Sequence, residues 1–206
     1  GNGRAIKSRY WSPNRVDRID DPINAIFWLM KDPSIPPVIR LNDPSLGAAM
    51  GATLATKRTS AERLAPGVDP DALVVEPYAN PFRTYPLEID YLRFKKLIED
   101  GVACYVLNTG AFMGKKIPAK LTLRIIESII DGKADFSRWE PFEDIDTIPV
   151  EGFNISFEQE TFRKEFIARF YDHIHFIESR QTAKGGIDKL PDDALAALNR
   201  VILKLV

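Results

Sequence analysis

Hydrophobic and polar positions alternate along the chain in a way that predicts helices interleaved with short strands. The run Ala25–Met30 is continuously hydrophobic, short and bounded by prolines, which favours a buried strand over a helix. Val102–Leu107 is the clearest strand of the sequence. Over 87–99 hydrophobic residues recur at helical spacing, and Asp100-Gly101 is a stop signal that ends this helix.

The same patterns predict the other elements. Ile35–Val38 is excluded from a central strand or a helix interior, because its two adjacent prolines fix φ and lack N–H donors. The small residues of 46–55 predict a segment that lies close against its neighbours. We also predict a helix beginning near Pro44, a short strand over 73–75, helices over 121–130, 157–179 and 191–205, and short strands near Ile148 and Phe153. The helix over 121–130 is expected to place its hydrophobic residues on the core side: Leu121, Ile125, Ile126, Ile129 and Ile130.

Helices and strands in series, followed by a helical tail, predict an α/β fold. The residues alone leave both a parallel and a mixed sheet open. A chain of 206 residues is long enough to bury a hydrophobic core. Its 28 basic and 29 acidic residues nearly cancel, which argues against a nucleic-acid partner. No hydrophobic run approaches the roughly 20 residues of a membrane span, so we predict no membrane partner.

Cysteine and histidine are too few to predict a metal or nucleophile site. Cys104 is the only cysteine and lies in a hydrophobic run, so we interpret it as a buried, inert thiol. The absence of an intrachain disulfide is typical of a reducing compartment, and we predict a cytoplasmic protein. His173 and His175 are two positions apart on a predicted helix, so they face different directions and form a poor metal pair.

The segment Tyr105–Ile117 carries the most chemical information. It reads as a hydrophobic strand, a glycine-containing loop, two lysines and the start of a helix, an order typical of a site for a phosphorylated ligand. Its spacing fits neither a P-loop nor a dinucleotide fingerprint. The alternative is a loop that needs two glycines for its backbone geometry, with lysines in solvent.

This segment resembles the adenine-binding segment of ATP-dependent phosphoenolpyruvate carboxykinases. In that family a strand ending in Tyr-Leu-Val-Asn-Thr-Gly precedes a glycine-rich loop, then Gly-Lys-Arg-Ile, and a Thr five residues after the Ile. The equivalent order here is Tyr105–Gly110, Gly114–Ile117 and Thr122. The resemblance implies that Lys116, Ile117 and Thr122 bind the adenosine end of ATP. Lys116 replaces the family's Arg, which keeps the charge but loses the planar guanidinium.

Two further segments are similar to the same family, in the same order. The stretch Ile26–Pro44, followed by Lys57 and Glu62, resembles the strand, proline pair and helix that precede the adenine-binding segment. Asn14-Arg15-Val16 resembles the family's Asn-Thr-Arg-Val. The resemblance implies a catalytic Arg15 that meets the γ-phosphate and the substrate carboxylate, a role suited to a guanidinium. The alternative for Arg15 is a basic N-terminal tail.

Together the matches run from about residue 15 to about residue 153. They imply an α/β fold with a mixed sheet, flanking helices and a helical C-terminal tail, equivalent to the C-terminal portion of a carboxykinase. We predict a partial nucleotide-binding domain over 1–156 and a helical segment over 157–206 that covers it. The chain begins with Gly1 rather than Met, so we interpret it as a C-terminal fragment whose partner is its own missing N-terminal part.

The implied reaction of the whole protein converts oxaloacetate and ATP to phosphoenolpyruvate, ADP and carbon dioxide. The implied metal is Mg²⁺ or Mn²⁺, and we expect its ligands and the phosphate loop outside this chain, so that the fragment alone is inactive. Two alternatives stay open. One is a divergent regulatory or non-catalytic nucleotide-binding module of the same fold. The other is a protein-interaction domain that docks a partner through the helix over 157–179.

Overall fold

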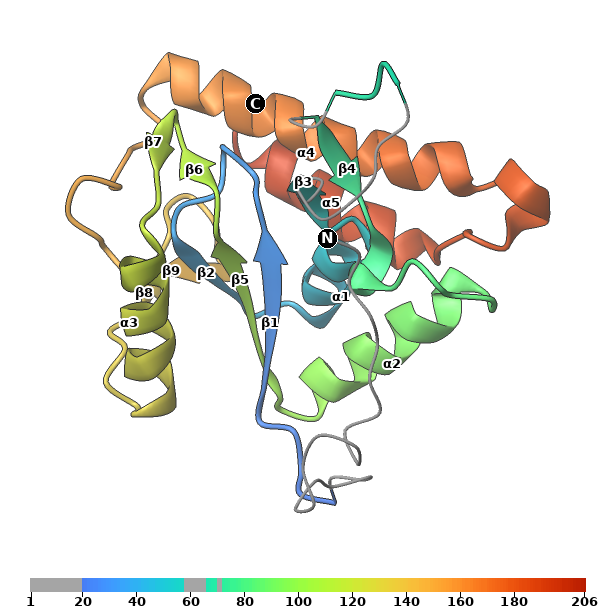
Figure 1. Ribbon diagram of the computed structural model, residues 1–206, viewed down its shortest axis with the longest axis horizontal. Helices are drawn as coiled ribbons and strands as arrows, with labels where there is room; N and C mark the ends of the chain where they lie inside the picture. Colours follow the sequence, from blue (N-terminus) through green and yellow to red (C-terminus); the bar gives the residue numbers. More distant parts are fainter. Residues whose placement is uncertain (1–19, 58–65, 70–71) are drawn as a thin grey trace.

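The computed structural model describes residues 20–57, 66–69 and 72–206, and it shows a mixed α/β protein (Figure 1). The strands are β1 (Ala25–Met30), β2 (Val38–Leu41), β3 (Ala55–Lys57), β4 (Leu73–Val75), β5 (Ala103–Asn108), β6 (Ala111–Phe112), β7 (Lys115–Lys116), β8 (Ser137–Arg138) and β9 (Ile145–Thr147). The helices are α1 (Pro44–Ala52), α2 (Leu87–Glu99), α3 (Ala119–Ile130), α4 (Glu160–Arg180) and α5 (Asp192–Leu203), with short 3₁₀ turns η2 (Pro77–Ala79) and η3 (Ala183–Gly186).

The main sheet is mixed, and its strand order is β1-β5-β2-β9-β8. β1 and β5 run parallel, with Phe27 opposite Tyr105 and Met30 opposite Asn108. The remaining neighbours in this sheet, β5-β2, β2-β9 and β9-β8, are antiparallel. Because β1 and β5 are parallel, their carboxyl ends meet at one edge of the sheet, and the segments that follow Met30 and Asn108 lie side by side there.

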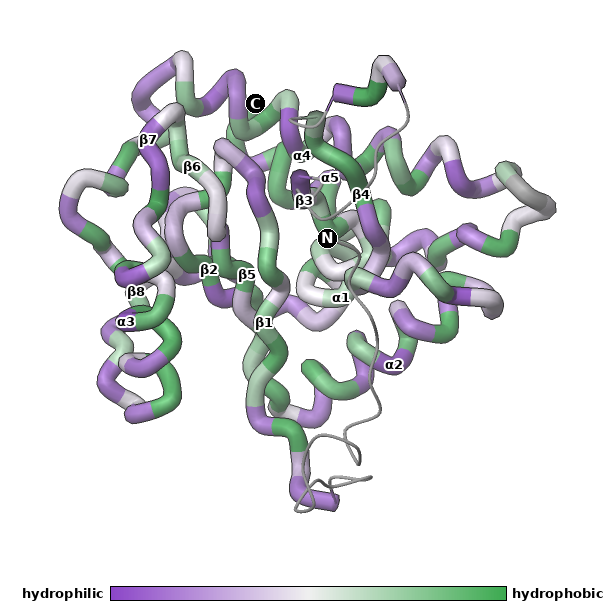
Figure 2. Tube along the Cα trace, in the orientation of Figure 1, coloured by the Kyte–Doolittle hydropathy of each residue, from purple (hydrophilic) through white to green (hydrophobic). Residues whose placement is uncertain are grey.

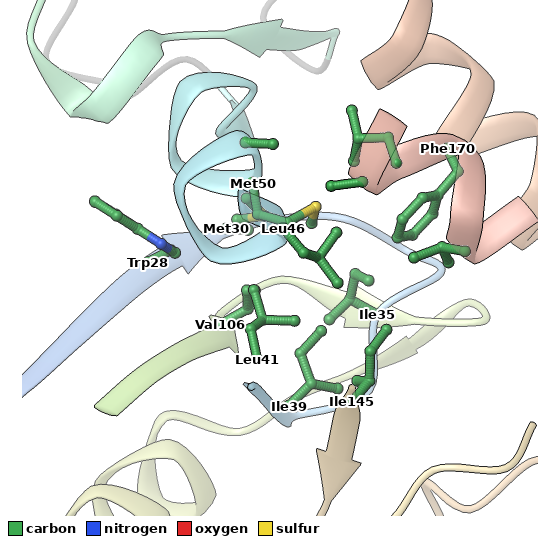
Figure 3. Close-up of a cluster of buried hydrophobic side chains, with 14 of the residues drawn as sticks. Trp28, Met30, Ile35, Ile39, Leu41, Leu46, Met50, Val106, Ile145 and Phe170 are labelled. Atoms are coloured by element: carbon green, nitrogen blue, oxygen red, sulfur yellow. The ribbon is translucent and has the colours of Figure 1, made fainter. Parts of the chain in front are cut away.

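Helices cover both faces of this sheet. α3 lies on one face, where Ile125 joins Val38, Tyr105 and Leu107 in a buried cluster. The other face is covered by α1, α4 and α5 (Figure 1). Figure 3 shows the core on that face, where side chains from β1, β2, α1 and α4 converge. Its labelled residues are Trp28, Met30, Ile35, Ile39, Leu41, Leu46, Met50, Val106, Ile145 and Phe170.

The small residues of α1 bring this helix close to the sheet and to α2, as the sequence predicts. Asp43 caps α1 by accepting a hydrogen bond from the Leu46 amide at 2.6 Å. A Cβ at Gly47 would lie 2.7 Å from Ile98 Cδ1, and one at Gly51 would lie 2.6 Å from Trp28 Cζ2. Any larger residue at these two positions would therefore displace α1.

The hydrophobic stripe of α4 faces the protein's own core. Phe162, Phe166 and Phe170 are at most 1% exposed, and they belong to a cluster that also contains residues of β1 and β2. This cluster joins residues on both sides of the predicted boundary between 156 and 157. The stripe is thus covered within the chain.

Most predicted elements are present at the predicted places. β1 and α2 have the predicted bounds, and α2 stops before Gly101, whose φ of 95° suits glycine. Figure 2 shows the alternation of hydrophobic and hydrophilic residues along α2 and α3 from which these helices were predicted. Among the described residues, no helix has the length and hydrophobicity to cross a bilayer.

Three local predictions are wrong. The Pro-rich stretch was expected to exclude a central strand through Val38, yet Val38 is the first residue of β2, in the middle of the sheet. Phe153 lies in no strand, because it follows a turn instead of pairing with the sheet. Ile130, expected on the core side of α3, is 74% exposed. Each of these positions is decided by the neighbours that the fold supplies rather than by local sequence.

Candidate functional site

The turn after β5 is held by the side chain of Asn108, which is fully buried. Its amide nitrogen lies 2.6 Å from the carbonyl oxygens of both Asp32 and Ile35, and 3.0 Å from that of Ala111. Its Oδ1 accepts a hydrogen bond from the Gly110 amide at 3.0 Å. One side chain therefore ties β5 to the segment after β1 and to the start of β6.

Thr109 and Gly110 complete this connection between the two parallel strands. The Thr109 amide and hydroxyl both donate to the Met30 carbonyl, at 2.8 and 3.1 Å. A Cβ at Gly110 would lie 3.1 Å from Lys31 Cβ and 3.3 Å from Lys31 Cα, so glycine permits the close approach of the two backbones. The polar groups of the Asn-Thr-Gly motif are thus used within the protein, as the alternative of a structural glycine loop requires.

The two lysines lie on a small hairpin that β6 and β7 form. Its turn residues Met113 and Gly114 have φ values of 45° and 79°, and such left-handed pairs are typical of tight hairpin turns. Lys115 Nζ donates to the Gly152 carbonyl at 2.9 Å and lies 4.6 Å from the centroid of the Phe153 ring. Lys115 therefore connects the hairpin to the loop after β9.

Lys116 is the cation that this hairpin leaves accessible. It is exposed and forms no hydrogen bond or ion pair with the part of the chain that the structure describes. α3 begins three residues later at Ala119, after Pro118, without a side-chain cap and without an acidic residue in its first turn. Lys120, in that first turn, is also exposed. Free amides and the helix dipole make such a helix start favourable for an anion.

Ile117 and Thr122, the other two predicted adenosine-binding residues, lie beneath this surface. Ile117 is 3% exposed and belongs to the large core cluster, while its amide donates to the Gly110 carbonyl at 2.9 Å. Thr122 is 8% exposed in the first turn of α3. The structure thus brings Lys116, Ile117 and Thr122 into one short segment, with Lys116 on its surface and the other two side chains inside.

The remaining residues of the resemblance are less informative. Arg15, the predicted catalytic residue, and Glu62 lie outside the described residues. Lys57 is the last residue of β3, a two-stranded sheet with β4 that is separate from the main sheet. In the described ranges, no group of three or more His, Cys, Asp or Glu side chains has an arrangement that fits a metal ion.

A small cavity lies behind the β6–β7 hairpin, and sequence reasoning missed it. Its volume is about 240 Å³, below the roughly 300–1,000 Å³ typical of pockets for drug-sized ligands. The walls are mostly aromatic and hydrophobic, with one arginine. They include Pro36, Phe112, Arg138, Trp139, Phe153 and Ile155. The aromatic residues in the acidic connection over 136–156 were the only sequence signal for it.

A buried polar cluster under the turn was also missed. The carboxylate of Asp32, fully buried just after β1, accepts hydrogen bonds from the Ser34 amide and hydroxyl through Oδ1. Its Oδ2 lies 3.5 Å from His173 Nε2 and 3.6 Å from Arg169 Nε. Burial raises the pKa of Asp32, but the nearby His173, together with Ser34 and Arg169, outweighs burial and lowers this pKa to about 2.

His173 and His175 differ as the sequence predicts for positions two apart on a helix. His173 is 2% exposed and faces Asp32, whereas His175 is exposed. The signal that would have found the buried one is spacing, because His173 follows Phe166 by seven positions and precedes Ile177 by four on the hydrophobic stripe of α4. A polar residue on such a stripe needs a buried partner.

In comparisons with known proteins, no protein-family model matches this chain, and no curated protein sequence matches it. What the described site offers chemically therefore rests on its own residues. It has an exposed cation and an uncapped helix start on the surface, above a turn whose polar groups are occupied internally.

Proposed function

We propose that this chain is the adenosine-seating part of a nucleotide-binding domain similar to that of ATP-dependent phosphoenolpyruvate carboxykinases. The observation that carries the proposal is Lys116, exposed and unpaired within the described chain, three residues before the uncapped start of α3. The order Asn108-Thr-Gly110, glycine, lysine pair, isoleucine and threonine supports it, because it resembles that family's adenine-binding segment.

The proposed roles follow from the burial of each side chain. The Lys116 ammonium stays in solvent at the mouth of the site, and its four-carbon stem offers an apolar surface for the edge of a purine. Ile117 and Thr122 lie below it and fix the backbone on which the nucleotide rests. Lys120 and the free amides of α3 favour the negative charge of the phosphates.

The proposed reaction of the whole protein is that implied by the resemblance. Oxaloacetate loses carbon dioxide, and the enolate oxygen that remains takes the γ-phosphoryl group of ATP, which leaves phosphoenolpyruvate and ADP. Arg15 would hold the γ-phosphate and the substrate carboxylate bidentately. Mg²⁺ or Mn²⁺, when bound, supplies charge neutralisation at the phosphates. We propose that the metal ligands and the phosphate loop lie in an N-terminal part of the protein, in a cytoplasmic setting.

The proposal is tested by ATP binding to the 206-residue chain, measured by isothermal titration calorimetry with wild type and Lys116→Ala. We expect binding in wild type and an affinity about five- to tenfold lower in the variant, since one charge-assisted phosphate or ring contact contributes about 1 kcal/mol. Lys133→Ala is the matched control, because Lys133 is also exposed, lies just beyond α3 and pairs with Asp131. Equal affinity in wild type and Lys116→Ala, or no binding at millimolar ATP, contradicts the proposal.

A second candidate is a nucleotide-binding regulatory module without catalysis. The replacement of the family's arginine by Lys116 favours it, because an ammonium cannot stack on a base as a guanidinium does. The two candidates separate on turnover by a protein that carries this chain together with the proposed N-terminal part. ATP-dependent decarboxylation of oxaloacetate that is lost in Arg15→Ala supports the enzyme, and ATP binding without turnover supports the regulatory module.

A further inference from the structure

The three buried polar atoms around Asp32 lack a hydrogen-bond partner among the described residues. They are Asp32 Oδ2, His173 Nε2 and Arg169 Nε. They converge within ion-pair distance, at 3.5 and 3.6 Å from the carboxylate oxygen. Buried polar groups are almost always satisfied in folded proteins, so this convergence needs a role.

The ring of His173 faces an acceptor at each end. Its Nδ1 lies 3.1 Å from the Thr53 carbonyl, which only accepts hydrogen bonds, so Nδ1 carries a hydrogen. With a neutral ring, Nε2 would then turn a lone pair toward the Asp32 carboxylate. Only the doubly protonated imidazolium presents a hydrogen to both oxygens. The charged groups around it are Asp32 and Arg169, and Arg169 in turn pairs with the exposed Asp172 at 2.5 Å.

From Asp32 a continuous path of hydrogen bonds leads to the candidate site. The Asp32 carbonyl accepts from Asn108 Nδ2 at 2.6 Å, and Asn108 Oδ1 accepts from the Gly110 amide at 3.0 Å. The Gly110 carbonyl then accepts from the Ile117 amide at 2.9 Å, one residue after Lys116. Every link is a buried or partly buried group, where such bonds are strongest.

We infer that His173, paired with Asp32 through Nε2, is a positioning residue that holds the Asn108 turn and the β6–β7 hairpin in place. We call the path His173–Asp32–Asn108–Gly110–Ile117 the positioning relay. α4 thereby fixes, from the far side of the sheet edge, the backbone that presents Lys116. The effect of the relay on nucleotide affinity rests on the proposed function. Its stabilisation of the Asn108 turn does not.

The first test is a spectroscopic signature in the wild-type chain, which does not depend on the folding of His173→Gln. The chain has only two histidines, so His175→Gln assigns both ring signals in ¹⁵N NMR spectra. We expect His173 Nε2 to carry a hydrogen that faces the Asp32 carboxylate. A His173 ring with a hydrogen on Nδ1 alone overturns the inference, because the link to Asp32 would then be missing.

The second test is amide hydrogen exchange of nucleotide-free His173→Gln. We expect the Gly110 and Ile117 amides to exchange roughly ten- to a hundredfold faster relative to the amides of β9, since the loss of a hydrogen bond to a charged group weakens the relay by about that factor. His175→Gln on the same helix is the matched control and should leave the ratio unchanged. Acceleration that is equal in β9 and in the turn means general loosening and overturns the relay.

Two further outcomes separate this inference from the proposed function. If the exchange result holds and wild type binds ATP, His173→Gln should also weaken ATP binding several-fold while His175→Gln does not. If the exchange result holds and wild type does not bind ATP, the relay stands and the nucleotide proposal fails. Should His173→Gln not fold, Ser34→Ala replaces it: this variant removes only the hydroxyl that donates to Asp32 Oδ1 at 2.7 Å, and roughly threefold faster exchange of the same two amides is expected.

Discussion

Two regions at the same edge of the sheet use their polar side chains in opposite ways. The Asn108 side chain is buried, and the amides of Asn108, Thr109 and Gly110 each donate to a neighbouring segment or to the Asn108 side chain. A few residues further on, Lys116 and Lys120 are exposed and unpaired within the described chain. The comparison teaches that the most motif-like residues of a segment can be its scaffold, while less distinctive neighbours face solvent.

The largest effect is expected from Asn108→Ala. This variant leaves the carbonyls of Asp32 and Ile35 and the Gly110 amide without their bonds in a buried place. We expect the free energy of unfolding to fall by about 4 kcal/mol, measured by urea denaturation. Asn199→Ala is the control, because Asn199 makes one hydrogen bond on the surface of α5 and should cost less than about 1 kcal/mol. Equal losses in the free energy of unfolding would mean that the Asn108 side chain contributes no more to stability than that of Asn199.

An intermediate effect is expected from acid, through Asp32. Its pKa in the folded chain is about 2, below its ordinary value of 3.8, so its carboxylate stabilises the fold above pH 4. That contribution of about 2 kcal/mol is lost as the pH falls from about 4 to about 2, where the carboxyl takes up a proton in the folded state. Urea denaturation of wild type and Asp32→Asn between pH 5 and pH 2 measures it. Asp32→Asn should lose less stability over this range than wild type, and parallel curves would contradict the assignment.

The smallest effect on stability is expected from Lys116→Ala. An exposed side chain without a partner in the described chain contributes little to folding, so the free energy of unfolding should change by no more than about 0.5 kcal/mol. The same urea denaturation measures this. A loss above about 1 kcal/mol would show that Lys116 belongs to the scaffold with Asn108, which would remove the contrast between the two regions.

Sequence patterns were sufficient for elements that carry their own signals. β1 is a short hydrophobic run between prolines, α1 begins at a proline after Asp43, and α2 combines helical spacing with a stop signal, and their places were predicted. β2 was not, because a four-residue strand after two prolines is specified only by β5 and β9 on either side of it. Its place in the sheet is a tertiary property.

The candidate site, too, has features that the sequence predicts and features that depend on tertiary contacts. The sequence placed Lys116, Ile117 and Thr122 in one segment, but burial of Ile117 and Thr122 depends on α3 and on the core below them. The pairing of Asp32 with His173 joins residues that are far apart in the chain, so no local pattern contains it. Spacing on α4 indicates that His173 faces the core, yet this spacing does not identify Asp32 as the residue that His173 contacts.

The buried thiol of Cys104 makes it possible to measure how fast the protein opens around it. Burial raises its pKa to about 12, and the side chain is 1% exposed between α1 and the sheet. A thiolate is the form that reacts with alkylating agents, so this sulfur reacts only when the protein opens around it. As the only cysteine in the chain, it reports the rate of that opening without any introduced label.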